Sequence, residues 1–279
     1  MRDALCFSDA VMGVTSVETR TSLVAFAEGL SRAEGMLRSY HDSVGAPVTV
    51  QCSDVVDRIA TNARIVLTMT LTKAILFSRS VIESINGGNL LVAFHSLRGY
   101  LELVAVTRFT VERMRPLIVK AATTRQLSAE DATTLASHFE ILLHGGRFNW
   151  IAYFEEGPRG MLERKRLKRA RQDRQKFEAN SLRINCCIDD WAKKHEAVEF
   201  VYDYLCDLVH PNKGSNLVLL VERDGQVIFN VDDRSTMGIW VLERVFPLAA
   251  SLCLSGVGEV VAFTSILGGN SHPPKACDP

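Results

Sequence analysis

The chain lacks the sequence motifs that mark the common nucleotide and hydrolase sites. Its 279 residues contain no Walker loop, no Gly-x-Ser-x-Gly elbow and no His-Glu-x-x-His helix. One Gly-x-Gly echo, Gly256-Val-Gly258, has no third glycine and too little chain after it for a βαβ unit. Strands and helices do not alternate along the sequence, which argues against a nucleotide-binding α/β fold.

The chain also lacks an excess of charge of either sign. It has 32 Lys and Arg against 32 Asp and Glu, so its formal net charge is zero. This balance argues against a protein that coats nucleic acid or an acidic membrane with its whole surface. A composition of 47% hydrophobic and 23% charged residues is typical of a globular protein and excludes a disordered or fibrous chain.

Cysteines are few, and their spacing fits neither a metal site nor a disulfide framework. The seven cysteines are odd in number, contain no Cys-x-x-Cys pair, and have one close pair, Cys186-Cys187, which is adjacent. This usage predicts reduced thiols and a cytoplasmic location. The N-terminus has no apolar segment of the kind found in secretory signals.

A long uninterrupted hydrophobic run is missing as well. Val245–Leu267 carries one charge, Glu259, but Pro247, Gly256 and Gly258 interrupt its apolar residues. A membrane span needs about 20 consecutive apolar residues. The pattern therefore favours a buried last helix followed by a second apolar turn or strand. We expect no membrane partner for the protein, and the sequence leaves open whether residues 245–267 contact a membrane.

What is present is mainly helical periodicity. It predicts an all-α fold, a helical bundle of about seven helices with one β-hairpin inserted before the last helix. Asn89 and Ser128 are predicted helix caps, Pro116 is predicted to disturb the helix from Leu90, and one helix is expected to run through Trp191 to His210. The predicted regions are a helical segment and connector at 1–50, the bundle at 51–268 with the hairpin at 216–231, and a flexible tail at 269–279.

Three polar residues interrupt the apolar helix that starts at Leu90. His95, Arg98 and Glu102 lie at positions i, i+3 and i+7, so they share one stripe. An unpaired buried Arg98 would be costly, and Glu102 at i+4 is its nearest candidate partner. The stripe is either a buried polar network that fixes the register of the helices or part of a functional cleft.

A second candidate lies where a later helix ends. His210 precedes Pro211-Asn212, and a helix C-terminus favours a protonated imidazole that could transfer protons. The alternative is a simple C-cap. Asp203 belongs to a stripe of acidic residues on the same helix, which is usually a solvated face. We assign His95, Asp203 and Asn212 to a supporting polar network.

Two short motifs resemble a known group of proteins. The residues Gly88-Asn89, Phe94, Arg98 and Leu101-Glu102, with Tyr204-Leu205 and Val209-His210-Pro211, are similar to those of little-characterised bacterial helical proteins related to the HEPN superfamily. The resemblance covers roughly residues 65–265. It implies a helical bundle in which Arg98, Glu102 and His210 converge as catalytic residues, and many HEPN proteins are RNA-cleaving toxins or abortive-infection effectors. The Arg-x4–6-His signature of that superfamily is absent.

A basic run gives a separate indication of a partner. Residues 159–176 contain nine basic and two acidic residues. Such a helix suits phosphate backbones, and RNA or another nucleic acid is one expected partner. The alternative is a solvated helix that pairs with the chain's own acids. The predicted nucleic-acid-binding residues are Arg164, Lys165, Arg166, Lys168, Arg169 and Arg171.

Two functional hypotheses follow. The first is an RNA-directed effector of HEPN-like type, a metal-independent ribonuclease in which Arg98 stabilises phosphate charge and His210 transfers protons. The second is a non-catalytic helical interaction protein whose basic helix binds an acidic partner. We predict no metal, because Glu140 and His144 lack the Glu-x-x-His spacing of di-iron bundles, and no cofactor. The sequence leaves open whether the chain forms a homo-oligomer.

Overall fold

The computed structural model describes residues 5–44, 55–124, 127–144, 183–210, 213–229 and 236–267, and positions 154, 157, 159–160 and 163. The all-α class is confirmed, but the expected number of about seven helices is too low, because the described residues form nine. The long helices are α2 (Val17–Val44), α3 (Val55–Asn86), α4 (Leu90–Thr124) and α11 (Thr236–Leu267). The shorter elements are α1 (Asp9–Val14), α5 (Ala129–His144), α8 (Ile184–Ala192), α9 (Ala197–Val209), α10 (Lys213–Val218), β1 (Leu220–Arg223) and β2 (Gln226–Phe229).

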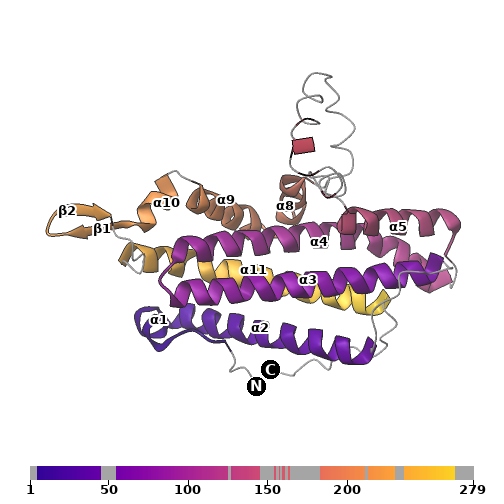
Figure 1. Ribbon diagram of the computed structural model, residues 1–279, viewed down its shortest axis with the longest axis horizontal. Helices are drawn as coiled ribbons and strands as arrows, with labels where there is room; N and C mark the ends of the chain where they lie inside the picture. Colours follow the sequence, from indigo (N-terminus) through magenta and orange to yellow (C-terminus); the bar gives the residue numbers. More distant parts are fainter. Residues whose placement is uncertain are drawn as a thin grey trace.

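The four long helices lie side by side, and α4 lies between α3 and α11 on one side and the short helices α8 and α9 on the other (Figure 1). Helices α3 and α11 pack on one side of α4, and α2 packs beneath them against both. The short helices α8 and α9 cover the opposite side of α4. This position explains why the start of α4 is apolar on nearly every face: Phe94, Leu97 and Leu101 are all fully buried.

The core forms two clusters along the bundle. In the larger one, Phe26 from α2 meets Phe246 from α11 edge to face, with their ring centroids 5.4 Å apart. Phe94 of α4 belongs to the same cluster. The smaller cluster contains Phe139 of α5 and Phe263 near the end of α11. Helix α2, from the predicted N-terminal region, therefore shares a core with α4 and α11.

Both predicted caps are confirmed. Helix α3 ends at Asn86, Gly88 takes a φ of 72°, and the side-chain oxygen of Asn89 accepts a hydrogen bond from the Val92 N–H at 3.2 Å. At α5, the Ser128 hydroxyl accepts one from the Asp131 N–H at 3.1 Å. The turn at Gly88 and the cap at Asn89 join α3 and α4 as an antiparallel pair.

Two predicted interruptions of helices are wrong, and one real interruption was not predicted. Helix α4 continues through Pro116, and α11 continues through Pro247 instead of giving way to a second apolar element. Apolar packing outweighs the lost hydrogen bond at each proline. Buried side chains flank Pro247, while Met114 before Pro116 is buried and Leu117 and Ile118 after it are partly buried. Conversely, the single helix expected through Trp191 to His210 is two helices. The chain turns after Ala192, so that α8 crosses α4 while α9 runs along it (Figure 1).

The segment predicted as a hairpin at 216–231 has different limits. Residues 216–218 belong to helix α10, and the two strands have four residues each. They pair antiparallel with Leu220 opposite Phe229, and Asp224 and Gly225 take the positive φ values of the turn. This pair projects from one end of the bundle (Figure 1), so it adds no layer to the helical core.

Within the described residues, three helical segments are long and apolar enough to cross a membrane. They are Thr61–Asn86, Leu90–Lys120 and Gly238–Phe263. About half of the most apolar window of each one is buried inside the bundle.

Candidate functional site

The predicted pair on α4 is present. Arg98 Nη2 lies 3.0 Å from Glu102 Oε1, and each side chain is 22% exposed. His95, one turn earlier on the same helix, is exposed. The Arg98–Glu102 pair is therefore half-buried rather than sealed in the core, and His95 lies outside it.

Helix α9 completes the surroundings of Arg98. The Tyr202 hydroxyl donates a hydrogen bond to Glu102 Oε1 at 3.2 Å, and the Arg98 guanidinium faces the Tyr202 ring 5.7 Å from its centroid. Burial raises the pKa of Tyr202 to about 12, so this phenol remains a hydrogen-bond donor at neutral pH. Arg98, Glu102 and Tyr202 form a polar link between α4 and α9. The Arg98 Nε–H is buried without a hydrogen-bond partner among the described residues.

Sequence reasoning missed Tyr202 because it placed this residue on the apolar side of its helix. A buried tyrosine hydroxyl usually finds a polar partner, and that was the available signal. Cys206, one turn further along α9, also lies close to Arg98. Burial raises the pKa of the Cys206 thiol, and the positive charge of Arg98 opposes this rise without cancelling it.

His210 is exposed and lies two helical turns beyond Tyr202. Eight residues at a rise of about 1.5 Å each correspond to about 12 Å along the helix. Because α9 runs antiparallel to α4 (Figure 1), this displacement takes His210 toward the start of α4, on the His95 side of Arg98. The structure thus brings Arg98 and Glu102 together, and the contacts that Arg98 makes with α9 come from Tyr202 and Cys206 rather than from His210.

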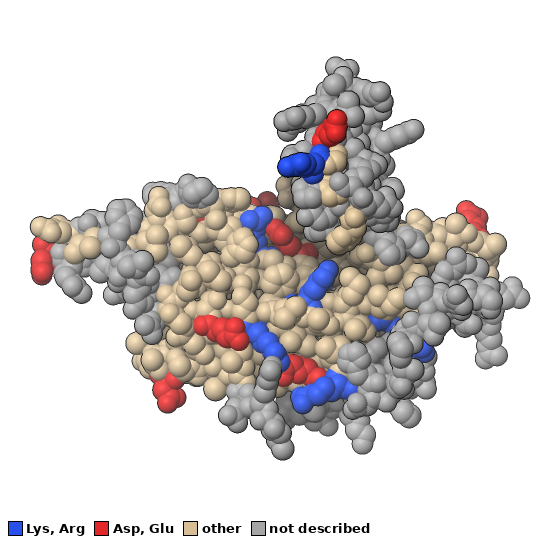
Figure 2. Space-filling model, in the orientation of Figure 1, with Lys and Arg blue, Asp and Glu red and all other residues tan. Residues whose placement is uncertain are grey.

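The remaining predicted residues are not part of this link. Asp203 is exposed on α9, as expected of a solvated acidic face. Asn212 and the basic residues 164–171 lie outside the described residues. On the face shown in Figure 2, blue and red side chains of the described residues occur in small mixed groups, without a continuous basic area.

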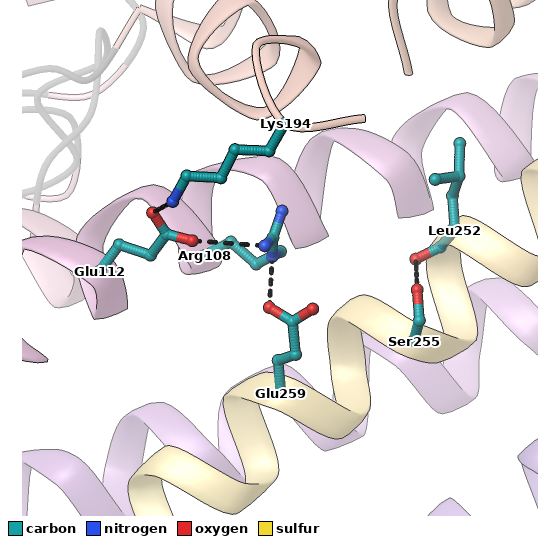
Figure 3. A network of polar contacts seen from close by, with 6 residues as sticks. All are labelled: Arg108, Glu112, Lys194, Leu252, Ser255 and Glu259. Carbon is teal, nitrogen blue, oxygen red and sulfur yellow. Dashed lines mark hydrogen bonds and ion pairs between the residues drawn. The ribbon is translucent and has the colours of Figure 1, made fainter. Parts of the chain in front are cut away.

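A second polar cluster, which sequence reasoning did not find, lies further along α4 (Figure 3). The Arg108 side chain is 7% exposed, and its Nε donates to Glu259 Oε2 of α11 at 2.7 Å. Its Nη2 lies 3.3 Å from Glu112 Oε1, and Lys194 donates to the other oxygen of Glu112. The guanidinium also packs 5.0 Å from the centroid of the Trp191 ring. We call Arg108, Glu112, Lys194, Glu259 and Trp191 the Arg108 cluster.

Every charge in the Arg108 cluster has a partner of opposite sign. Burial raises the pKa of Glu112. The hydrogen bond from Lys194 and the positive charges of Lys194 and Arg108 lower this pKa by a larger amount, so the net shift is downward. The cluster also explains Glu259, the one charge in the apolar sequence Val245–Leu267. It joins α4, α11 and the chain after α8, and such a paired arrangement is typical of a structural network.

The described cysteines are free thiols in very different surroundings. Cys6 and Cys186 are exposed, Cys206 is half-buried, and Cys187 and Cys253 are buried. Burial raises the pKa of Cys187 to about 11. No group of three or more His, Cys, Asp or Glu side chains that could hold a metal occurs within the described parts of the chain.

The adjacent thiols Cys186 and Cys187 are expected to react at very different rates. At pH 8, a thiol with a pKa two units above its ordinary value carries about 100-fold less thiolate, and thiolate is the reactive form. Iodoacetamide labelling followed by peptide mass spectrometry should therefore modify Cys186 at least about 100-fold faster than Cys187. The ratio of the two labelling rates should fall as the pH rises toward 11, and the rates should become equal in urea. Equal rates in the folded protein would contradict the burial of Cys187.

Comparison of the chain with models of protein families, with curated proteins and with solved structures gives no match.

Proposed function

We propose that this protein is a non-catalytic helical interaction protein whose basic run at 159–176 binds an acidic partner. The observation that carries the proposal is the state of Arg98. Its charge is balanced by Glu102 at 3.0 Å on the same helix, and the pair is tied to α9 through Tyr202. A cation already used to join two helices is poorly suited to stabilise a phosphorane, which needs a donor free to meet the developing charge.

The position of His210 supports the same proposal. A general acid or base must come within hydrogen-bond reach of the reacting group, directly or through one water. The α9 side chains that interact with the Arg98 guanidinium are Tyr202 and Cys206, whereas His210 lies one turn beyond Cys206, at the end of the helix. As part of the proposal, the protein is cytoplasmic and free of membrane, which fits the free thiols of the described cysteines.

An RNA-directed effector of HEPN-like type is the second candidate. Two observations favour it: the Arg98 and Glu102 side chains are each 22% exposed, and the Arg98 Nε–H has no hydrogen-bond partner among the described residues. His95 and His210, both exposed, would then supply the proton transfer on the same side of Arg98.

A cleavage assay separates the two candidates. We expect wild-type protein and His210→Ala to leave a labelled single-stranded RNA intact in EDTA, as judged on a denaturing gel beside an active ribonuclease. If the wild type cleaves the RNA and His210→Ala lowers the rate by about 10²–10⁴-fold while remaining folded, the non-catalytic proposal is wrong. His195→Ala, at another exposed histidine, is the matched control.

The partner is tested by fluorescence anisotropy with two polyanions of equal length, a labelled poly-Glu peptide and a single-stranded RNA. We expect the peptide to bind, and to bind more weakly as salt is added. Changing Arg164, Lys165, Arg166, Lys168, Arg169 and Arg171 to Gln should remove that binding. If the peptide does not bind at low salt, the partner is not acidic protein; RNA bound more than tenfold tighter than the peptide would favour the second candidate.

A further inference from the structure

A groove of about 540 Å³ lies at one end of the bundle, and none of the residues that line it belongs to the link of Arg98, Glu102 and Tyr202. It is formed where α1, the turn between α3 and α4, and the first turns of α11 meet (Figure 1). Aliphatic side chains make most of its wall, including Val11, Ile85, Leu90 and Ile239. Its volume is within the range of about 300–1,000 Å³ in which small-molecule sites are found.

An exposed tryptophan borders this groove. Trp240, on the second turn of α11, leaves 47% of its surface open to solvent, and Val14 on α1 leaves 59%. The Trp240 ring already has a cation near it, since the Arg244 guanidinium lies 5.2 Å from the ring centroid. Indole is the aromatic group that binds cations best, so the ring is suited to meet a positively charged ligand.

One charged residue lines the groove among the described residues, and it is acidic. Glu243 Oε1 accepts a hydrogen bond of 2.6 Å from the Ser16 backbone N–H, which holds the carboxylate in place. Glu243 Oε2 has no further hydrogen-bond partner within the described chain, and it remains available to a ligand. Arg244, by contrast, is exposed and does not line the groove.

From these features we propose that the groove binds a small organic cation, an amine or quaternary ammonium group carried on an apolar body. Glu243 supplies the negative charge, Trp240 supplies a face for the cation, and the aliphatic wall takes the apolar body. This site is separate from the Arg98 link and goes beyond the proposed function. The charge of Glu243 sets the preference, because the other lining residues are uncharged.

A second groove offers a built-in control. It has about 510 Å³, lies between the N-terminal segment and α2, and is also mostly apolar. Its lining includes both Glu28 and Arg32, one turn apart on α2, so its two charges are of opposite sign. We therefore expect this groove to show no preference for a cation.

The experiment compares three probes of the same chain length by isothermal titration calorimetry: hexyltrimethylammonium, 1-hexanol and hexanoate. We expect the cation to bind the wild-type protein at least about 10-fold more tightly than the other two. Glu243→Gln keeps an acceptor for the Ser16 N–H but removes the charge. It should lower the affinity for the cation about 10-fold without changing the affinity for 1-hexanol. Arg244→Gln, which removes a competing positive charge beside Trp240, should raise the affinity for the cation.

Two further variants keep the test decisive. Glu28→Gln in the second groove should leave all three affinities unchanged. Trp240→Leu, at an exposed position, should lower the affinity for the cation, and its circular dichroism spectrum should show that the fold is intact. The proposal is overturned if no probe binds at 10 mM, if all three bind equally, or if Glu243→Gln and Glu28→Gln have the same effect.

Discussion

Replacing Arg108 with Met is expected to lower the free energy of unfolding by about 3 kcal/mol. Breaking a buried ion pair by removing one partner costs about 3–5 kcal/mol, because it leaves an uncompensated charge. Here the Arg108 side chain is 7% exposed, but Glu259 and Glu112 keep 43% and 27% of their side chains exposed, which places the effect at the lower end. Met retains most of the apolar volume, so the loss reports on charge and hydrogen bonding rather than on a cavity.

Urea denaturation followed by circular dichroism measures this change, and Arg79→Met is its control. Arg79 also pairs with a glutamate, Glu34 on α2, but 38% of its side chain is exposed. Pairs of that kind contribute about 0–1 kcal/mol, so Arg79→Met should cost much less than Arg108→Met. Equal losses for the two variants would show that the Arg108 cluster is not a buried network.

The effect of Arg108→Met should also depend on pH. The pKa of Glu112 is lowered in the folded protein, so its contribution to stability is present above the pKa of the unfolded chain, about 4.3, and is lost as the pH falls through the lower folded value. The difference in unfolding free energy between wild type and Arg108→Met should therefore be constant from pH 5 to 7 and shrink below about pH 4. A difference that does not change down to pH 3 would contradict the ionic character of the cluster.

Local features of the fold could be predicted from the sequence because they depend on residues close together in the chain. The caps at Asn89 and Ser128 involve the next three residues, and Arg98–Glu102 is an i,i+4 pair on one helix. The mostly apolar segment after Leu90 likewise indicates a helix that is buried on most of its faces. Each of these inferences needs helical geometry alone, which is regular enough to be worked out before any tertiary contact is known.

Contacts between helices could not be predicted, because they depend on how the helices are placed against one another. Arg108 and Glu259 are 151 residues apart, and Tyr202 meets Glu102 across 100 residues. The same limitation explains the error at Pro247, where buried contacts of α11 outweigh a local signal to break the helix. The sequence predicted that His210 lies at the end of a helix. It could not predict where His210 lies relative to Arg98, because this depends on how α9 packs against α4.

The close approach of α4 and α11, on which the Arg108–Glu259 contact depends, involves Gly256. A Cβ atom added to Gly256 would lie 2.1 Å from Cγ1 of Val104 and 3.5 Å from Cδ of Arg108. Valine is stiff about χ1 and cannot easily turn away, so the helices would have to separate. At Gly258, two residues later on the same helix, an added Cβ atom meets nothing within 4 Å.

The substitution Gly256→Ala is therefore expected to destabilise the protein, and Gly258→Ala to stabilise it. Overpacking a core costs about 1–3 kcal/mol, whereas Ala is better than Gly inside a helix by about 1 kcal/mol. The two variants carry the same chemical change on one helix, so the gain in helix propensity cancels and the difference between them, about 1–3 kcal/mol, isolates the α4–α11 contact. Midpoints of urea denaturation measure it. If both variants gain stability equally, α4 and α11 do not meet at Gly256; Glu259, one turn further along α11, could not then reach Arg108.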